Sequence, residues 1–98
     1  MHPKHKKGTA SKIAVMKVFV DDGHYVYNEM NNTGPVDFVA IHPFTKQVKL
    51  IEVKTMSFRS ETSKKPGTMI NRVLSDVQKK LGVSLVYHNV DTGAIKYA

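Results

Sequence analysis

Two short apolar runs, at residues 36–41 and 48–53, most constrain the fold of this chain. Both runs are rich in valine and isoleucine, residues that favour β-strands. Only six residues, 42–47, separate them, and parallel strands need a connection of a dozen residues or more. The two runs are therefore predicted to pair as an antiparallel hairpin, around which the rest of the fold is built.

Two further segments carry apolar residues at helical spacing. The first helix is predicted over residues 10–22, with Gly23 as its stop. The second begins at the N-cap Asn71 and ends at Gly82. The apolar faces that should bury the two helices are formed by Ile13, Met16, Phe19, Val20, Leu74, Val77 and Leu81.

Three more strands complete the pattern, and they are predicted at residues 24–30, 83–90 and 94–97. The elements then follow the order α-β-β-β-α-β-β, which predicts an α/β fold with a central mixed β-sheet flanked by helices. A chain of 98 residues has room for one core, so we expect a single domain over residues 1–98. Residues 1–8 are basic, and we expect them to form a flexible N-terminal tail.

The charge of the chain is strongly positive, with a net value of +7. Residues 1–12 hold four lysines and no acid, and residues 54–80 hold seven basic residues against two acids. Basic residues gathered into two stretches are typical of proteins that bind nucleic acid. The same charge also fits a solubilising surface, so charge alone leaves both interpretations open.

Composition excludes several classes of protein. Cysteine is absent, which excludes disulfides, zinc ribbons and thiol chemistry and is compatible with a reducing compartment. The longest apolar runs are far shorter than the ~20 residues that span a bilayer, and no apolar stretch follows the basic N-terminus to form a signal peptide. We therefore expect a cytoplasmic protein without membrane contact.

Acidic residues occupy two positions of the predicted hairpin that should face each other. If position 41 lies opposite position 48, Asp37 lies opposite Glu52, and Lys54 projects from the same face as Glu52. Two opposed carboxylates repel each other, and a divalent cation between them would remove the repulsion. The Lys54 ammonium would help, and it could orient a water or stabilise developing charge. A shift of one residue in register would place Asp37 on the other face.

The segments 34–40 and 49–55, which carry Pro35, Asp37 and the Glu-Val-Lys triplet, resemble the PD-(D/E)xK nuclease superfamily. The small Holliday junction resolvase-like endonucleases, of archaeal or phage type, are the most similar members. A protein of the phage type would be expected in the host cytoplasm. The resemblance extends over roughly residues 8–90 and implies a restriction-endonuclease-like core. It also implies that Asp37, Glu52 and the backbone carbonyl of Val53 bind Mg²⁺, which Mn²⁺ could replace. Lys54 would assist the water that attacks the phosphodiester.

The sequence departs from that family on the first helix, where many relatives carry a glutamate. Ser11 or Lys12 falls near that place, which leaves a second metal site in doubt. Glu29 or Glu61 could supply a missing ligand, although both fit surface positions at least as well. Gln78, on the second helix, resembles a polar residue that some relatives direct at the site.

These observations together predict a Mg²⁺-dependent DNA endonuclease, a phosphodiester hydrolase that acts on branched DNA. A four-way junction has two-fold symmetry and needs paired cuts, which favours a homodimer. The residues expected to contact DNA phosphates are Lys4, Lys6, Lys7, Arg59, Lys64 and Lys65. The alternatives are a nicking or duplex-cutting endonuclease of the same superfamily, a catalytically silent DNA-binding module on this fold, and a small basic RNA-binding protein.

Overall fold

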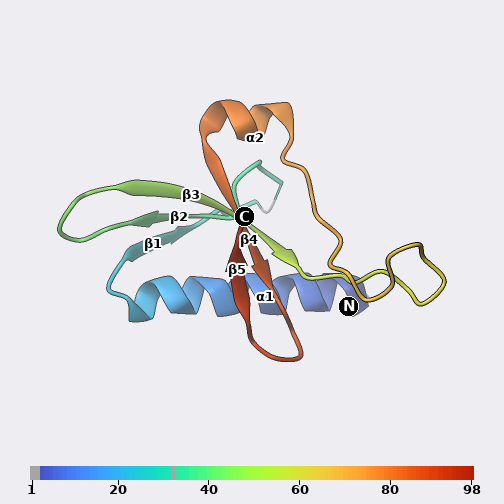
Figure 1. The fold of residues 1–98 in the computed structure, drawn as a ribbon. Coiled ribbons are helices and arrows are strands. Elements are labelled where there is room, and N and C mark those ends of the chain that lie inside the picture. The colour runs from blue at the N-terminus through green and yellow to red at the C-terminus, as the bar shows by residue number, and fades with distance from the viewer. Residues whose placement is uncertain (1–2, 32) are drawn as a thin grey trace.

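The computed structural model describes residues 3–31 and 33–98, with side chains from residue 6 onward. Along this part of the chain the elements are α1 (Pro3–Asp21), β1 (Tyr25–Asn28), β2 (Phe38–Ile41), β3 (Val48–Thr55), α2 (Asp76–Leu81), β4 (Val83–His88) and β5 (Ile95–Tyr97) (Figure 1). The predicted α/β class with a mixed sheet is confirmed. Neither described helix is long and apolar enough to cross a membrane.

The strands form one sheet in the order β1-β2-β3-β4-β5. The pairs β1–β2, β2–β3 and β4–β5 are antiparallel, whereas β3 and β4 are parallel because α2 carries the chain back between them. In the predicted hairpin, Ile41 lies opposite Val48 and Phe38 lies opposite Ile51. The predicted register is therefore confirmed. β3 runs two residues further than predicted, so Lys54 lies within the strand.

α1 lies across one face of the sheet, which we call the α1 face (Figure 1). The core is formed between this helix and the sheet by Val15, Phe19, Phe38, Ala40, Ile51, Val53 and Val86. Because side chains alternate along a strand, the residues between these strand positions project from the opposite face, which we call the second face. α2 lies on the side of the second face, where it packs against β4.

The predicted apolar face of the first helix is only half correct. Phe19 is buried and Met16 packs against the core, but Ile13 and Val20 are 61% and 56% exposed. The buried stripe instead begins at Ser11, four residues before Val15. Ser11 can be buried because its hydroxyl is hydrogen-bonded, and an unpaired buried hydroxyl would be costly.

The ends of α1 differ in how well the sequence predicted them. The helix starts at Pro3 rather than at residue 10, so residues 3–8 of the expected tail are its first turns. Proline is favoured at a first helical position, where its missing N–H costs nothing. At the other end, Gly23 stops the helix as predicted, with a φ of 87°. His24 N–H donates to the Phe19 carbonyl there, so the last turn is closed by backbone hydrogen bonds.

α2 is shorter and less buried than predicted. Its N-cap is Ser75 and not Asn71, because Ser75 and Gln78 cap each other's backbone N–H groups. The helix ends at Gly82 as expected, with that residue in the left-handed conformation. The predicted apolar stripe is wrong, since Val77 and Leu81 are exposed. A helix of less than two turns offers little surface to bury. The Gln78 side chain links it to the rest of the fold through a hydrogen bond to the Pro35 carbonyl.

The segment between β3 and α2 forms a projecting arm. Phe58 and Met69 pair as an isolated antiparallel bridge at its base. Beyond the bridge, Arg59 N–H donates to the Thr68 carbonyl and Gly67 N–H donates to the Arg59 carbonyl. The arm, residues 57–70, extends away from the sheet near the N-terminal end of α1 (Figure 1). The arm is thus folded back on itself.

Candidate functional site

Asp37, Glu52 and Lys54 lie together on the second face of the sheet. Glu52 and Lys54 alternate with Ile51 and Val53, which are buried against α1. Asp37 directly precedes Phe38, the partner of Ile51, so it is next to Glu52 across the hairpin. The structure therefore brings together the three residues for which the sequence analysis predicted catalysis.

Hydrogen bonds hold each member of this group. Asp37 Oδ2 accepts a hydrogen bond of 2.7 Å from Val53 N–H, and Asp37 N–H donates to the Ile51 carbonyl at 2.8 Å. Lys54 Nζ lies 3.2 Å from Glu52 Oε1 as an ion pair. Glu52 is buried, whereas the Lys54 side chain is 47% exposed. The geometry thus places a buried Glu52 carboxylate beside a half-buried Asp37 carboxylate, with the Lys54 ammonium group open to solvent.

The electrostatics of Glu52 follow from this arrangement. Burial raises the pKa of the Glu52 carboxyl above its ordinary value, and the neighbouring charge of Asp37 raises this pKa further. Lys54 and Lys12 act in the other direction, because their positive charges favour the ionised form. The repulsion between the two opposed carboxylates, expected from the sequence, is therefore a feature of the folded protein. A cation near both groups would relieve it.

The residues present suit a hard divalent cation. Two carboxylates and a backbone carbonyl are oxygen ligands of the kind that Mg²⁺ accepts, with water completing its octahedral shell. Asp37 Oδ2 and Glu52 Oε1 have partners within the protein. The two carboxylates, with the Val53 carbonyl, are the groups that would hold the ion. Among the described residues, no three His, Asp or Glu side chains gather closely enough to hold an ion. Water would therefore supply most of the ligands.

The glutamates considered as a missing ligand lie elsewhere. Glu29 Oε1 accepts a hydrogen bond from Asn31 N–H within the connection between β1 and β2. Glu61 is exposed on the arm. Lys12 lies near enough to Glu52 to lower its pKa, so the place on the first helix carries positive charge. The site therefore contains two carboxylates and the Lys54 ammonium group, and the positive charge of Lys12 also acts on Glu52.

Ser11 and Gln78, which were also considered, have different surroundings. Ser11 is fully buried on the α1 face, where its hydroxyl lies 2.7 Å from Thr55 Oγ1 and 2.9 Å from His88 Nδ1. It ties α1 to β3 and β4 and does not face the carboxylates. Gln78 Nε2 donates to the Pro35 carbonyl at 2.9 Å, two residues before Asp37. Gln78 therefore links α2 to the segment that carries the carboxylate.

The predicted DNA-binding residues fall into two groups. Lys6 and Lys7 are exposed on the first turns of α1, whereas the Lys4 side chain lies outside the described residues. The other group, Arg59, Lys64 and Lys65, is exposed on the arm. None of these described side chains is neutralised by a salt bridge among the described residues. The first turns of α1 and the arm, which carry the two groups, lie at the same end of the molecule (Figure 1).

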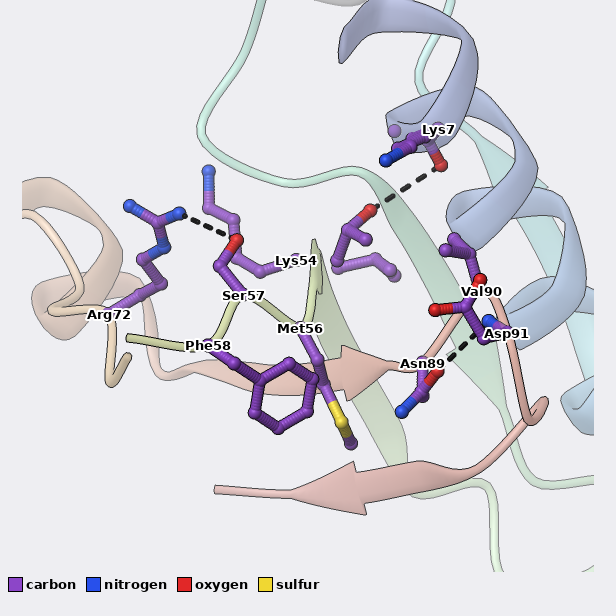
Figure 2. Close-up of a pocket in the computed structure, with 12 residues that line it drawn as sticks. Lys7, Lys54, Met56, Ser57, Phe58, Arg72, Asn89, Val90 and Asp91 are labelled. Carbon is purple, nitrogen blue, oxygen red and sulfur yellow. Dashed lines mark hydrogen bonds between the residues drawn. The ribbon is translucent and has the colours of Figure 1, made fainter. Parts of the chain in front are cut away.

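An open groove of about 720 Å³ lies between the N-terminal end of α1 and the base of the arm, at the carboxyl ends of β3 and β4. α1, the end of β3, the base of the arm, Arg72 and the turn after β4 form its walls (Figure 2). Lys54 belongs both to this groove and to the carboxylate site. The sequence analysis missed Phe58 and Arg72, which have no local motif and reach the groove only through the fold.

No protein-family model matches this chain, and no curated protein shows significant similarity to it. The function therefore has to be inferred from the residues and from the geometry that they adopt.

Proposed function

We propose that this protein is a Mg²⁺-dependent DNA endonuclease of the PD-(D/E)xK type that hydrolyses phosphodiester bonds in branched DNA. One observation carries the proposal: Asp37 lies across the hairpin from Glu52, beside Lys54, in a site where burial and repulsion raise the pKa of Glu52. Paired carboxylates of this kind, without a compensating cation, destabilise a sheet. A bound metal ion would offset the repulsion between these carboxylates and so explain why both are present.

The roles of the residues follow from their contacts. Asp37 and Glu52 would hold the ion with the Val53 carbonyl, and Val53 N–H keeps Asp37 in place. A bound Mg²⁺ supplies a Lewis acid for the phosphoryl oxygen and lowers the pKa of a coordinated water. Lys54 is exposed enough to reach a phosphate, where its ammonium group can orient the attacking water or stabilise the charge that develops on the phosphoryl oxygens.

The charge distribution supports DNA as the substrate. Lys7 and Lys54 border the groove beside the carboxylates, and the basic arm adjoins it. Contacts to phosphates supply most of the affinity for DNA, and they require exposed cations. The proposed DNA path therefore runs over the N-terminal end of α1 and the base of the arm.

A homodimer is part of the proposal. Exposed apolar side chains on the second face, those of Tyr25, Tyr27 and Val48, lie on the same face as the carboxylates. Exposed apolar patches of this kind mark interaction surfaces. Two copies related by a two-fold axis would present two equal sites to a symmetric junction. Light scattering on the purified protein tests this point directly.

A panel of labelled substrates tests the function. The wild-type protein is incubated with a four-way junction, a flap, a duplex and a single strand of equal length in Mg²⁺. We expect paired cuts in the junction and slower cleavage of the duplex. Ca²⁺ should support binding without turnover, because its looser coordination orients water poorly. Equal rates of cleavage of junction and duplex would refute the preference for branched DNA and indicate a general nuclease.

A catalytically silent DNA-binding module is the second candidate. The observation that favours it is the small number of acidic ligands: no cluster of three is present among the described residues, and Lys12 places a positive charge near Glu52. The same panel separates the two candidates. Binding of all substrates without cleavage in Mg²⁺ or Mn²⁺ would support the silent module.

A further inference from the structure

The groove at the carboxyl ends of β3 and β4 combines positive charge with an exposed aromatic ring. Three cations from three different segments line it: Lys7 of α1, Lys54 of β3 and Arg72 before α2. Asp91, on the turn after β4, is the one acidic residue among the lining residues. In Figure 2 Lys7 lies across the groove from Arg72 and Lys54, with the base of the arm below. The walls therefore suit a polyanion.

Arg72 is held in position at the edge of the groove. Its backbone N–H donates to Tyr87 Oη at 2.6 Å, and Tyr87 is buried on the second face. Its guanidinium contacts the Ser57 hydroxyl at 3.4 Å (Figure 2). An arginine fixed at both its backbone and its side chain loses little conformational freedom when it binds a phosphate. The groove is thus partly organised before a ligand arrives.

Phe58 is the feature that narrows the class of ligand. Its ring is 51% exposed although the residue lies at the base of the arm, where the Phe58–Met69 bridge fixes its backbone. An exposed ring beside phosphate-binding cations is typical of sites that stack nucleic-acid bases. The bases of a duplex are already stacked on each other, so the ring can stack only on an unpaired base.

We propose that this groove binds an unpaired strand of DNA, with one base stacked on Phe58 and the flanking phosphates held by Lys7 and Arg72. This proposal rests on the proposed function for the identity of the ligand, DNA, and adds that the bound strand is unpaired. Lys54 and Val53 belong to both the groove and the carboxylate site, so a strand in the groove would continue directly to the bond to be cleaved. The protein would then select places where a duplex opens, such as a junction or a flap.

Binding of labelled oligo(dT) to the full-length protein in Ca²⁺ tests the stacking contact. Phe58→Leu keeps an apolar side chain but removes the aromatic face. We expect it to weaken oligo(dT) binding roughly 5- to 100-fold, the effect of one lost base-stacking contact, and to change duplex binding little. The matched control is Phe44→Leu, since Phe44 is 87% exposed on the turn between β2 and β3. Equal effects of the two substitutions would overturn the inference.

The salt dependence of the same binding tests the cations. Arg72→Gln should flatten the log–log salt dependence for oligo(dT) by roughly 0.7, the loss of one phosphate contact on a single strand. Lys80→Gln, on an exposed lysine of α2 that does not line the groove, should leave the slope unchanged. If both variants have the same slope of salt dependence, Arg72 does not contact a phosphate and the strand does not bind in this groove.

Photocrosslinking of wild-type protein avoids any effect of substitution on folding. An oligonucleotide that contains 5-iodouracil should crosslink to Phe58, because that base would lie on its ring. A crosslink to Tyr25 or Tyr27 instead would overturn the inference.

Cleavage assays separate this inference from the proposed function. If the protein cleaves the junction but Phe58→Leu does not weaken oligo(dT) binding, only the proposal that the groove binds an unpaired strand is refuted. If oligo(dT) binding depends on Phe58 but no substrate is cleaved in Mg²⁺ or Mn²⁺, the proposed nuclease activity is refuted and strand binding in the groove is supported.

Discussion

On the α1 face of the sheet, Phe38, Ile51 and Val53 are buried against helix α1, while their chain neighbours Asp37, Glu52 and Lys54 project from the second face. The two sets alternate along the same two strands. The first set belongs to the hydrophobic core and stabilises the fold. The second set places like charges together and raises the pKa of Glu52, which costs stability. Along these strands, residues that stabilise the fold thus alternate with residues to which we assign the proposed chemistry.

Substitution of adjacent residues on β2 tests this contrast most strongly. Phe38 is fully buried, with its ring 5.6 Å from that of Phe19, whereas Val39 is half-buried on the second face. Phe38→Ala should lower the free energy of unfolding by about 3–5 kcal/mol because it leaves a cavity. Val39→Ala should lower it by about 1 kcal/mol. Urea denaturation measures both, and similar losses would show that the second face is as important to stability as the α1 face.

Gln78 tests whether α2 positions a residue of the second face, because its side chain is hydrogen-bonded to Pro35, two residues before Asp37. Gln78→Leu removes the hydrogen bond to the Pro35 carbonyl and half of the capping box. We expect a loss of about 1–2 kcal/mol in stability and a roughly 10- to 100-fold loss in cleavage, since Asp37 follows Pro35 closely. Ser75→Ala is the control, because it removes a cap but keeps the link to Pro35. If both variants cleave equally well, Gln78 does not position Asp37.

The pH dependence of stability gives the smallest expected effect. The folded protein holds the Glu52 proton more tightly than the unfolded chain does, because the pKa of Glu52 is raised above 4.5. The stability that this proton contributes is lost as the pH rises from about 4.5 through the raised pKa. At pH 7, Glu52→Gln should therefore be more stable than wild type by roughly 0.2–1 kcal/mol.

Thermal melts between pH 4.5 and 7.5 measure this difference. The gain from Glu52→Gln should shrink toward the acid end, where wild-type Glu52 is itself protonated. Glu61→Gln, on the exposed arm, serves as the control and should show no such trend. A gain that does not depend on pH would mean that the charge of Glu52 is not the cause.

The parts of the site that lie within the hairpin could be predicted from the sequence. A short connection and strict alternation determined which residues of the two strands face each other, and therefore placed Asp37 with Glu52 and Lys54. The end of each helix was equally predictable, because Gly23 and Gly82 adopt the left-handed conformation that stops a helix.

The remaining parts depended on tertiary contacts that leave no local pattern. Apolar residues occur on every side of α1, so the predicted apolar face included the exposed Ile13 and left out the buried Val15. The burial of Ser11 depends on His88, which is distant in sequence. The N-cap of the second helix was predicted at Asn71, whereas the reciprocal hydrogen bonds of Ser75 and Gln78 start the helix four residues later. The groove could not be predicted, because its walls come from four separate segments.

Cleavage of a labelled four-way junction by Asp37→Asn tests the central claim most directly. The substitution keeps the size of the side chain and removes the charge that faces Glu52. The account predicts a loss of cleavage in Mg²⁺ greater than about 100-fold, because the ion is lost, with junction binding in Ca²⁺ nearly unchanged. Asp22→Asn, at the exposed end of α1, should cleave like wild type. A wild-type rate of cleavage by Asp37→Asn would contradict the account.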